Sequence, residues 1–402
     1  MKTLYWMCFC VCLLLWNVAE AGTQEIENAA THRIDELIQQ LSDRKFSIRQ
    51  QAMGQLVALG GEAIPALKFA ISDGNRETRF RALRVLDAVE ENVFQQKLEE
   101  FLQAGVGDDK VSLPGWRRFC EQIDETSESR RLFVTMSRSA PRVMRSVDRG
   151  IGETGAAVDR RCIEVQLEKS KGRRALIPVG TVAALLFAAG IEDVKLARNS
   201  IKTVFSVCNY EAFRAEMYTV ISTNRIRYKS TPRSNMLREL FAGCLGQCES
   251  WDAQMALSLA MRYNIRQCVK RSLYLINDKK TPCHVVQIAM IAVGKFGELE
   301  HIPVLEQRID DTGFCGTIQR IENVQYRTQL RDVAIAVMLT IAGENPKEYG
   351  FVRMQYSTTR QVNYSTIGFA EESKRMETRA KWDAFRSDLE LPVAETADGE
   401  EK

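Results

Sequence analysis

The sequence IDELIQQLSDRKFSIRQQAMGQL at residues 34–56 is followed, thirty residues further on, by the similar sequence IPALKFAISDGNRETRFRALRVL at residues 64–86. Seven positions hold the same residue in both copies: Ile34 and Ile64, Leu37 and Leu67, Ser42 and Ser72, Asp43 and Asp73, Arg49 and Arg79, Ala52 and Ala82, and Leu56 and Leu86. Self-similarity at a fixed period of about 20–50 residues is typical of proteins built from stacked repeats. The two copies therefore predict a tandem-repeat architecture.

Each copy has the pattern of two short helices joined by a turn. Apolar residues recur at three- and four-residue intervals on either side of a polar break, which spans residues 42–45 in the first copy and 72–75 in the second. This spacing indicates amphipathic helices. The polar side chains between them can hydrogen-bond their own backbone and end a helix. Each copy is predicted to form a helical hairpin, which must stack on a neighbour to bury its apolar stripe.

The two copies resemble the HEAT and HEAT-like (armadillo-type) repeats. That family has a proline in the first helix, an aspartate eight residues later in the turn, and an arginine six residues after the aspartate. Pro65, Asp73 and Arg79 match all three positions, whereas Asp43 and Arg49 match two, because an aspartate replaces the proline of the first copy. The resemblance implies an all-α fold, a right-handed α-α superhelix or α-solenoid. It also implies a proline that bends the first helix and an aspartate–arginine ladder between successive turns.

The motif returns near the C-terminus, where Pro303 and Asp311 keep the eight-residue spacing. Threonine stands at the arginine position, residue 317. An insertion at residues 312–327 is expected to delay the second helix of this pair to residues 328–341. The insertion is one of two places where we expect a binding surface, the other being the basic middle of the chain. In repeat proteins, insertions commonly form loops on the face that binds partners.

The middle of the chain is predicted to be helical but degenerate, since helical periodicity persists there while the repeat motif fades. Pro178 is expected to open an apolar helix at residues 179–189, and Gly150–Gly155 is interpreted as a loop. A charged helix is predicted at residues 371–389. The predicted domain organisation is a signal peptide at 1–21, N-terminal HEAT-like repeats at 22–110, a degenerate helical solenoid region at 111–280, C-terminal HEAT-like repeats at 281–350, an extension with the charged helix at 351–391, and an acidic disordered tail at 392–402.

The N-terminus has the pattern of a secretory signal peptide. Lys2 is followed by an apolar run from Leu4 to Val18 and by Ala19-Glu20-Ala21, which fits an A-x-A cleavage site. The run is about 15 residues long, shorter than the roughly 20 that a membrane-spanning helix needs. We therefore expect an exported bacterial protein, secreted or periplasmic, with no membrane span after cleavage.

Eight cysteines lie beyond this leader: Cys120, Cys162, Cys208, Cys244, Cys248, Cys268, Cys283 and Cys315. An oxidising compartment permits disulfides, yet most of these cysteines lie in apolar helical segments, which favours buried thiols. One or two disulfides remain an alternative. Cys244 and Cys248 would share one helix face, but no second pair or histidine has a matching spacing, so no metal is expected.

The stretch from Leu113 to Lys280 is basic, with 29 lysine and arginine residues against 17 aspartate and glutamate residues. Its local concentrations, Arg117-Arg118 and Arg173-Arg174, are the predicted binding residues. Such a surface attracts acidic proteins, anionic polymers or nucleic acid. Nucleic acid is not expected, because no nucleic-acid motif accompanies the charge and the leader directs export. A solvated face without a ligand is the alternative interpretation.

The sequence offers little catalytic chemistry. The chain has three histidines and lacks the common phosphate-loop, zinc-protease and serine-hydrolase motifs. Cys283 and His284 are adjacent, so on a helix their side chains diverge and do not meet the geometry of nucleophilic catalysis. The predicted function is a non-enzymatic scaffold without a cofactor, which binds another protein or an anionic surface polymer. The family resemblance leaves an alternative, a lyase- or chaperone-type enzyme that handles a chromophore or a substrate protein.

Overall fold

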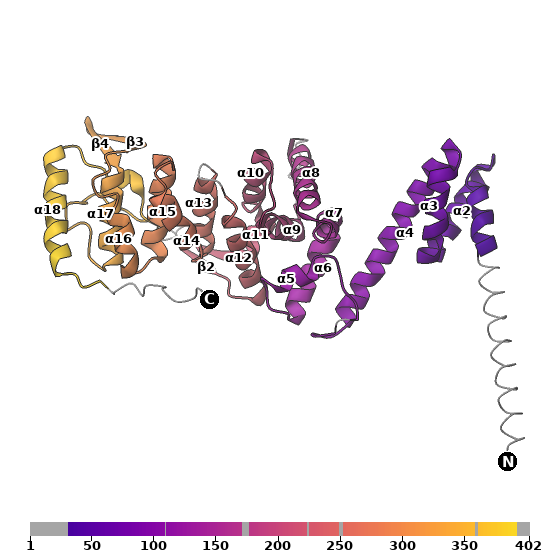
Figure 1. Cartoon of the computed structure of the whole chain (residues 1–402). Helices are drawn as coiled ribbons and strands as arrows, with labels where there is room; N and C mark the ends of the chain where they lie inside the picture. Colours follow the sequence, from indigo (N-terminus) through magenta and orange to yellow (C-terminus); the bar gives the residue numbers. More distant parts are fainter. Residues whose placement is uncertain are drawn as a thin grey trace, which may run out of the picture. The chain divides into compact units, whose positions relative to one another are not determined.

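The computed structural model describes residues 31–108, 110–170, 177–222, 225–248, 252–357 and 361–391 (Figure 1). The predicted signal peptide, the predicted acidic tail at 392–402 and the Arg173-Arg174 pair lie outside these residues. The chain forms two compact units. The N-terminal unit contains the described residues up to Ala104 together with 108 and 110–113, and the C-terminal unit contains 105–107 and the described residues from Pro114 onward.

The N-terminal unit consists of helical hairpins. Residues 31–40 are helical, and they are followed by α2 (Phe46–Leu59), the 3-10 helix η1 (Gly60–Ala63), α3 (Ile64–Asp73) and α4 (Arg76–Gln103). The turns fall at the two polar breaks that the sequence predicts. The buried side chains of both copies form one core: Ile34, Leu37, Leu41, Ala52, Leu56, Ala63, Leu67, Ala70, Ala82, Val85 and Val89.

Pro65 does not bend its helix. It lies in the first turn of α3, where a backbone N–H has no helical acceptor and where the fixed φ of proline suits the helix. Pro303 has the same place in α16 (Ile302–Glu306). The expectation of a bent first helix was therefore wrong, and the proline marks the start of the helix.

The arginines of the motif bind turn carbonyls, not the motif carboxylates. Arg49 donates through Nη1 to the carbonyl oxygen of Asp43, at 2.8 Å, and Arg79 donates through Nε to the carbonyl oxygen of Gly74, at 3.0 Å. The carboxylate of Asp43 instead accepts the N–H of Lys45 at 2.7 Å, as aspartates in turns commonly do. The expected aspartate–arginine ladder is thus replaced by arginines that cap the ends of the first helices within each hairpin.

A different arginine joins the two hairpins. Arg81, half-buried in α4, donates through Nη1 to the carbonyl oxygen of Leu41 at 2.7 Å, forty residues earlier. Leu41 lies just after the helical residues 31–40. Its carbonyl oxygen has no donor within the helix, and Arg81 supplies one. Glu77 forms an ion pair with the same guanidinium from one turn earlier.

Replacing Arg81 by leucine should destabilise the N-terminal unit by about 1–3 kcal/mol, because the change removes a charge-assisted bond and leaves a partly buried carbonyl unpaired. Replacing the exposed Arg79 by leucine should cost less than about 1 kcal/mol, since its bond lies in solvent. Native-state hydrogen exchange of amides in α3 and α4, read by mass spectrometry, measures both. Equal effects of the two substitutions would contradict the role given to Arg81.

The C-terminal unit is mostly helical. Its α-helices are α5 (Trp116–Cys120), α6 (Ser127–Ser139), α7 (Pro141–Ser146), α8 (Ile151–Ser170), α9 (Val179–Gly190), α10 (Arg198–Val207), α11 (Glu211–Met217), α12 (Pro232–Leu245), α13 (Ala253–Tyr263), α14 (Cys268–Asn277), α15 (Cys283–Phe296), α16, α17 (Leu330–Ile341) and α18 (Glu372–Asp388). Short 3-10 helices occur at η2 (Leu299–His301) and η3 (Tyr364–Thr366). Along the described parts of the chain, every helix is either too short or too polar to cross a lipid bilayer.

The later helices of this unit pack in two rows. Helix α13 packs on α15, α15 on α17 and α17 on α18, while α12 packs on α14 and α14 on α16 (Figure 1). Each helix of one row also contacts its sequence neighbour in the other row, as α14 does with α15 and α16 with α17. Successive helix pairs therefore lie side by side in this part of the chain.

Helix α9 forms the centre of the earlier part of the unit. Every residue from Gly180 to Ala189 is buried, and α6, α8, α10 and α12 pack around the helix. A Cβ atom at Gly180 would lie 2.5 Å from the carbonyl oxygen of Thr135 in α6, and one at Gly190 would lie 3.0 Å from the backbone nitrogen of Cys244 in α12. The two glycines let the backbones of neighbouring helices approach α9 closely.

The interpretation of Gly150–Gly155 as a loop was wrong, because α8 begins at Ile151 and includes Gly152 and Gly155. A Cβ atom at Gly155 would lie 2.6 Å from the carbonyl oxygen of Lys195. Glycine is therefore present for close packing and not to break the helix. A glycine that is needed for close helix packing cannot be distinguished in the sequence from a glycine that forms a turn.

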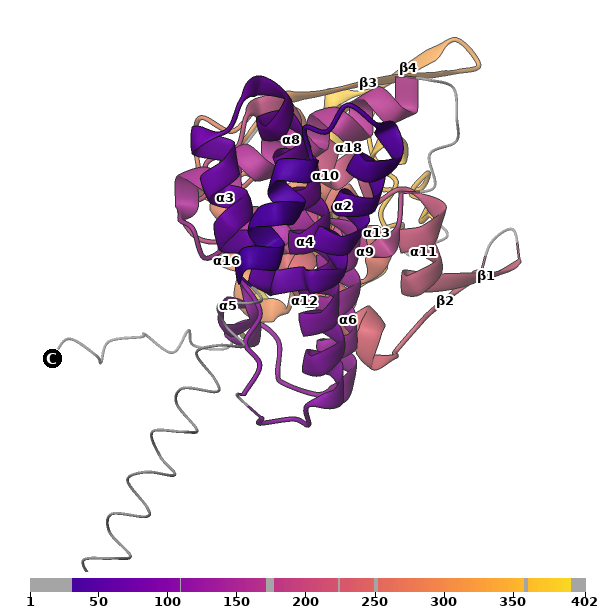
Figure 2. The same cartoon turned by 90° about the vertical axis from the view of Figure 1, so that its right-hand side faces the viewer.

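Two β-hairpins qualify the all-α prediction. Strands β1 (Tyr218–Ser222) and β2 (Arg225–Tyr228) form one, and β3 (Phe314–Ile321) and β4 (Val324–Gln329) form the other. Both extend from the helices of the C-terminal unit (Figure 2). The second hairpin occupies the insertion predicted at 312–327, and its two-residue turn, Glu322-Asn323, has positive φ at both positions, as type I′ turns require.

Replacing Gly180 by alanine should destabilise the C-terminal unit by about 1–3 kcal/mol, because the added methyl group overlaps a backbone oxygen in a packed core. The matched change, Gly243→Ala, places a methyl group on the exposed face of α12, where the nearest atom is 3.6 Å away. It should stabilise the unit by about 0.5–1 kcal/mol through helix propensity. Thermal unfolding by calorimetry measures both changes. If the Gly180→Ala variant had the same melting temperature as the wild type, the close packing of α9 against α6 would be disproved.

Candidate anion-binding site

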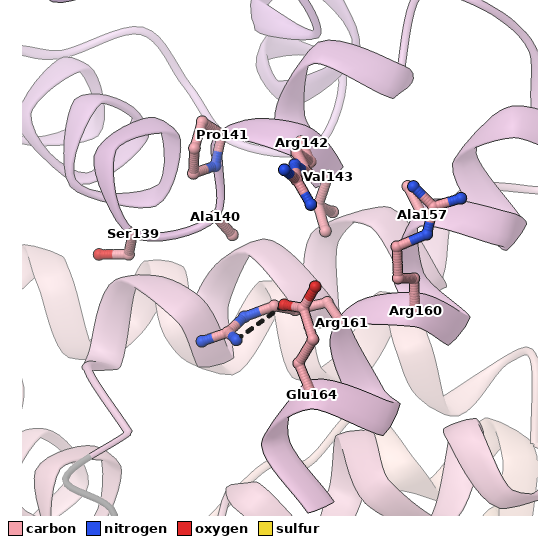
Figure 3. Close-up of a pocket in the computed structure, with 9 residues that line it drawn as sticks. All are labelled: Ser139, Ala140, Pro141, Arg142, Val143, Ala157, Arg160, Arg161 and Glu164. Atoms are coloured by element: carbon pink, nitrogen blue, oxygen red, sulfur yellow. Dashed lines mark hydrogen bonds and ion pairs between the residues drawn. The ribbon is translucent and has the colours of Figure 1, made fainter. Parts of the chain in front are cut away.

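A cavity of about 310 Å³ opens in the basic middle of the chain, where α7 meets α8 (Figure 3). Both helices belong to the C-terminal unit and pack on each other. The cavity is lined by Ser139, Ala140, Pro141, Arg142, Val143, Ala157, Arg160, Arg161 and Glu164. Its volume lies near the lower end of the range of small-molecule sites, which suits a single side chain or a small anion.

One wall is formed where α6 ends and α7 begins. Ala140 has a non-helical conformation, with φ −143° and ψ 59°, and Pro141 follows in the first turn of α7. This bend lets α7 leave the direction of α6 and directs the side chain of Arg142 to the cavity. Ala140 and Val143 are buried beneath it, so the wall is apolar at its base and cationic at its edge.

The other wall is one face of α8. Arg160 and Arg161 lie three and four residues after Ala157 and four and three residues before Glu164, the spacing that places side chains on a common helix face. Arg161 donates through Nη1 to Oε2 of Glu164 at 3.0 Å and to Oε1 of Glu168 at 3.2 Å. These two carboxylates fix the guanidinium of Arg161 along the helix.

The other two guanidinium groups are unpaired. Arg142 and Arg160 are exposed, and across the described parts of the chain neither of them forms a hydrogen bond or an ion pair. Figure 3 shows Arg142 on α7 and Arg160 on α8, so the two charges belong to different helices that meet at the cavity. The lining thus carries three arginines against one glutamate.

This arrangement is suited to bind an anion. A guanidinium group presents a planar fork of N–H donors that matches a carboxylate or a phosphate. Because Arg142 and Arg160 have no internal partner, they can bind an external anion without first breaking an ion pair. Ala140, Pro141, Val143 and Ala157 supply apolar contact for a short aliphatic stem attached to that anion.

The arginines of the cavity differ from those that the sequence singled out. Arg117 is exposed and Arg118 is half-buried in α5, and neither lines the cavity. The Arg160-Arg161 pair is as basic a signal as the predicted pairs and lies in the same stretch. No sequence signal distinguishes Arg142, whose place depends on the bend between α6 and α7.

The repeat residues near the C-terminus have structural roles. Asp311 accepts the N–H of Gly313 through Oδ1 at 2.8 Å and forms an ion pair with Arg308 at 3.1 Å. Aspartate side chains in turns commonly accept a backbone N–H two residues further on in this way. The arginine position of this copy, residue 317, lies in β3, so the hairpin separates the turn from α17.

The eight cysteines beyond the leader are all free thiols in the structure. Six of them are buried, Cys120 is half-buried and Cys283 is exposed. Burial raises the pKa of the Cys162 and Cys268 thiols to about 12, which keeps these groups protonated and unreactive at neutral pH. Trp116 and Trp382 are also buried, and Trp251 lies outside the described residues. Among the described residues, no three histidine, cysteine or acidic side chains are grouped as metal ligands.

No protein-family model, no curated protein and no solved structure matches the chain.

Proposed function

We propose that the protein is an exported, non-enzymatic helical scaffold of the HEAT-like type, which binds a protein partner by its acidic side chains. The cavity between α7 and α8, with the unpaired Arg142 and Arg160, is the observation that carries this proposal. Two uncompensated guanidinium groups beside an apolar wall fit a carboxylate at the end of a short aliphatic stem. Glutamate and aspartate side chains have that form.

The repeat architecture supports the scaffold role. The two copies that are thirty residues apart in the sequence form two helical hairpins that share one core. The helices from α12 to α18 pack in two rows. Stacked hairpins present an extended surface to partners. The leader pattern at residues 1–21 is the sequence evidence for export.

The apolar wall favours a protein over an anionic polysaccharide. A sulfated or carboxylated sugar chain presents hydroxyl groups beside each charge, and these require polar partners when they are desolvated. The lining of the cavity offers Ser139 as its uncharged polar side chain. Ala140, Pro141 and Val143 are better matched to methylene groups.

The double substitution Arg142→Ala/Arg160→Ala should weaken binding of a fluorescein-labelled octaglutamate peptide about tenfold, since two exposed ion pairs of about 0.5–1 kcal/mol each contribute about 1–2 kcal/mol together. Fluorescence anisotropy at 50 mM NaCl measures the affinity of the mature chain. Raising the salt concentration should weaken the wild-type complex.

The control is Arg117→Ala/Arg118→Ala, which removes the same two charges from α5. This variant should bind within about threefold of wild type, as expected for charges that act only through the screened field. Equal losses in both variants would indicate diffuse surface charge and refute the cavity. If dextran sulfate binds more tightly than the peptide, and its affinity falls in the Arg142→Ala/Arg160→Ala variant, the ligand of the cavity is an anionic polymer and not a protein.

A further inference from the structure

The β3–β4 hairpin leaves part of a strand edge open. On the outer edge of β4, Arg327 donates its N–H to the carbonyl oxygen of Phe369 at 3.0 Å and accepts the N–H of Phe369 at 3.2 Å. This is one isolated antiparallel bridge. Gly368 permits the close approach, since a Cβ atom there would lie 2.6 Å from the backbone of Arg327.

The backbone of Gln325 faces the same outer edge. In an antiparallel ladder, alternate residues direct their N–H and C=O groups to the same side, so Gln325 shares the side of Arg327. Antiparallel continuation of the bridge would place Glu371 opposite Gln325. Glu371 is instead the residue before α18, and its carbonyl oxygen accepts the N–H of Arg375. Among the described residues, no hydrogen bond joins the outward N–H and C=O of Gln325 to a partner.

A cavity of about 490 Å³ lies next to this open edge. Val324 and Tyr326 of β4 line one side, and the start of α18 lines the other. The remaining lining comes from residues 349–353 and 366–371. Phe351 and Phe369 are buried, with ring centroids 5.2 Å apart, and Ile367 is buried beside them. The interior of the cavity is therefore apolar.

The walls of the cavity are held in place by a buried ion pair, by a hydrogen bond to the strand and by a guanidinium–ring contact. In α18, Arg375 donates through Nε to Oδ1 of Asp332 at 2.7 Å, and both side chains are buried. The same guanidinium donates to the carbonyl oxygen of Arg327 at 3.2 Å. On the other side, the guanidinium of Arg353 lies 3.7 Å from the ring centroid of Tyr326. The site is thus formed before any ligand arrives.

The charges that line the cavity nearly cancel, since Arg353, Lys374 and Lys381 are set against Glu371 and Glu377. Lys374 and Glu377 form an ion pair at 3.0 Å, and Lys381 donates to the carbonyl oxygen of Glu348 at 3.0 Å. The exposed apolar side chains of Val324 and Val352 stand at the rim. An uncharged apolar side chain fits this cavity better than an anion.

We propose that an extended, uncharged segment of a partner protein adds to the outer edge of β4 at Gln325 and places one apolar side chain in the adjacent cavity. Main-chain hydrogen bonds supply affinity in this mode of recognition, and the pocket beside the strand supplies specificity. The site is distinct from the arginine cavity, and the proposal does not depend on anion binding there.

The test uses peptides selected from a random dodecamer display library on the full mature chain, with one selected peptide labelled for fluorescence anisotropy. Gln325→Pro removes the outward N–H and should weaken binding about tenfold, the effect of losing edge hydrogen bonds. Ala370→Trp, at the exposed rim of the cavity, leaves the strand backbone intact and should weaken binding to a similar extent.

Arg320→Pro is the matched control. Arg320 pairs with Gln325 across the hairpin, so its N–H faces the opposite edge, and proline is tolerated at such edge positions. Binding to this variant should stay within about threefold of wild type. Failure to select any binding peptide, or equal effects of both prolines together with no effect of Ala370→Trp, would overturn the proposal. If the wild-type chain is a dimer in sedimentation velocity and Gln325→Pro dissociates that dimer, a second copy of the chain occupies the edge. This result would also overturn the proposal.

Discussion

Helix α9 has ten consecutive buried residues, from Gly180 to Ala189, so each of its sides must be covered by another helix. Desolvating a helix that lacks a polar face is favourable only when neighbours cover it completely. Glycines near the two ends remove the methyl groups that would keep α6 and α12 at a distance. The positions of α6 and α8 are therefore fixed by α9. The bend from α6 into α7 then places Arg142 opposite the arginine face of α8, so the arginine-lined cavity is a consequence of how the apolar helix is covered.

The two proposed sites of the C-terminal unit recognise different chemistry. The cavity between α7 and α8 selects for negative charge and should weaken as salt screens its guanidinium groups. The open edge of β4 offers main-chain hydrogen bonds beside an apolar cavity, and these depend little on ionic strength. A partner with an acidic segment and an extended apolar segment could engage both, and the second contact would then be favoured by the effective concentration that the first creates.

The sequence predicted local features well and tertiary consequences poorly. The hairpins of the N-terminal unit follow from the thirty-residue period, and the apolar run after Pro178 predicts α9. Gly155 was misinterpreted because a glycine that admits a neighbouring backbone is indistinguishable in sequence from one that ends a helix. The β3–β4 hairpin was expected only as an insertion, since Glu322-Asn323 is a weaker turn signal than Asn-Gly or Asp-Gly. Arg142 had no sequence signal, because its role arises from a bend that the chain makes in three dimensions.

Hydrogen–deuterium exchange of the mature chain tests most directly whether α9 organises the C-terminal unit. The account predicts that amides of residues 181–190 exchange only when the whole unit unfolds, and that they are the slowest in it. Amides in the exposed β1–β2 hairpin should exchange much earlier. Exchange of the α9 amides within minutes under native conditions, at rates similar to those of the hairpin, would contradict the central position of this helix.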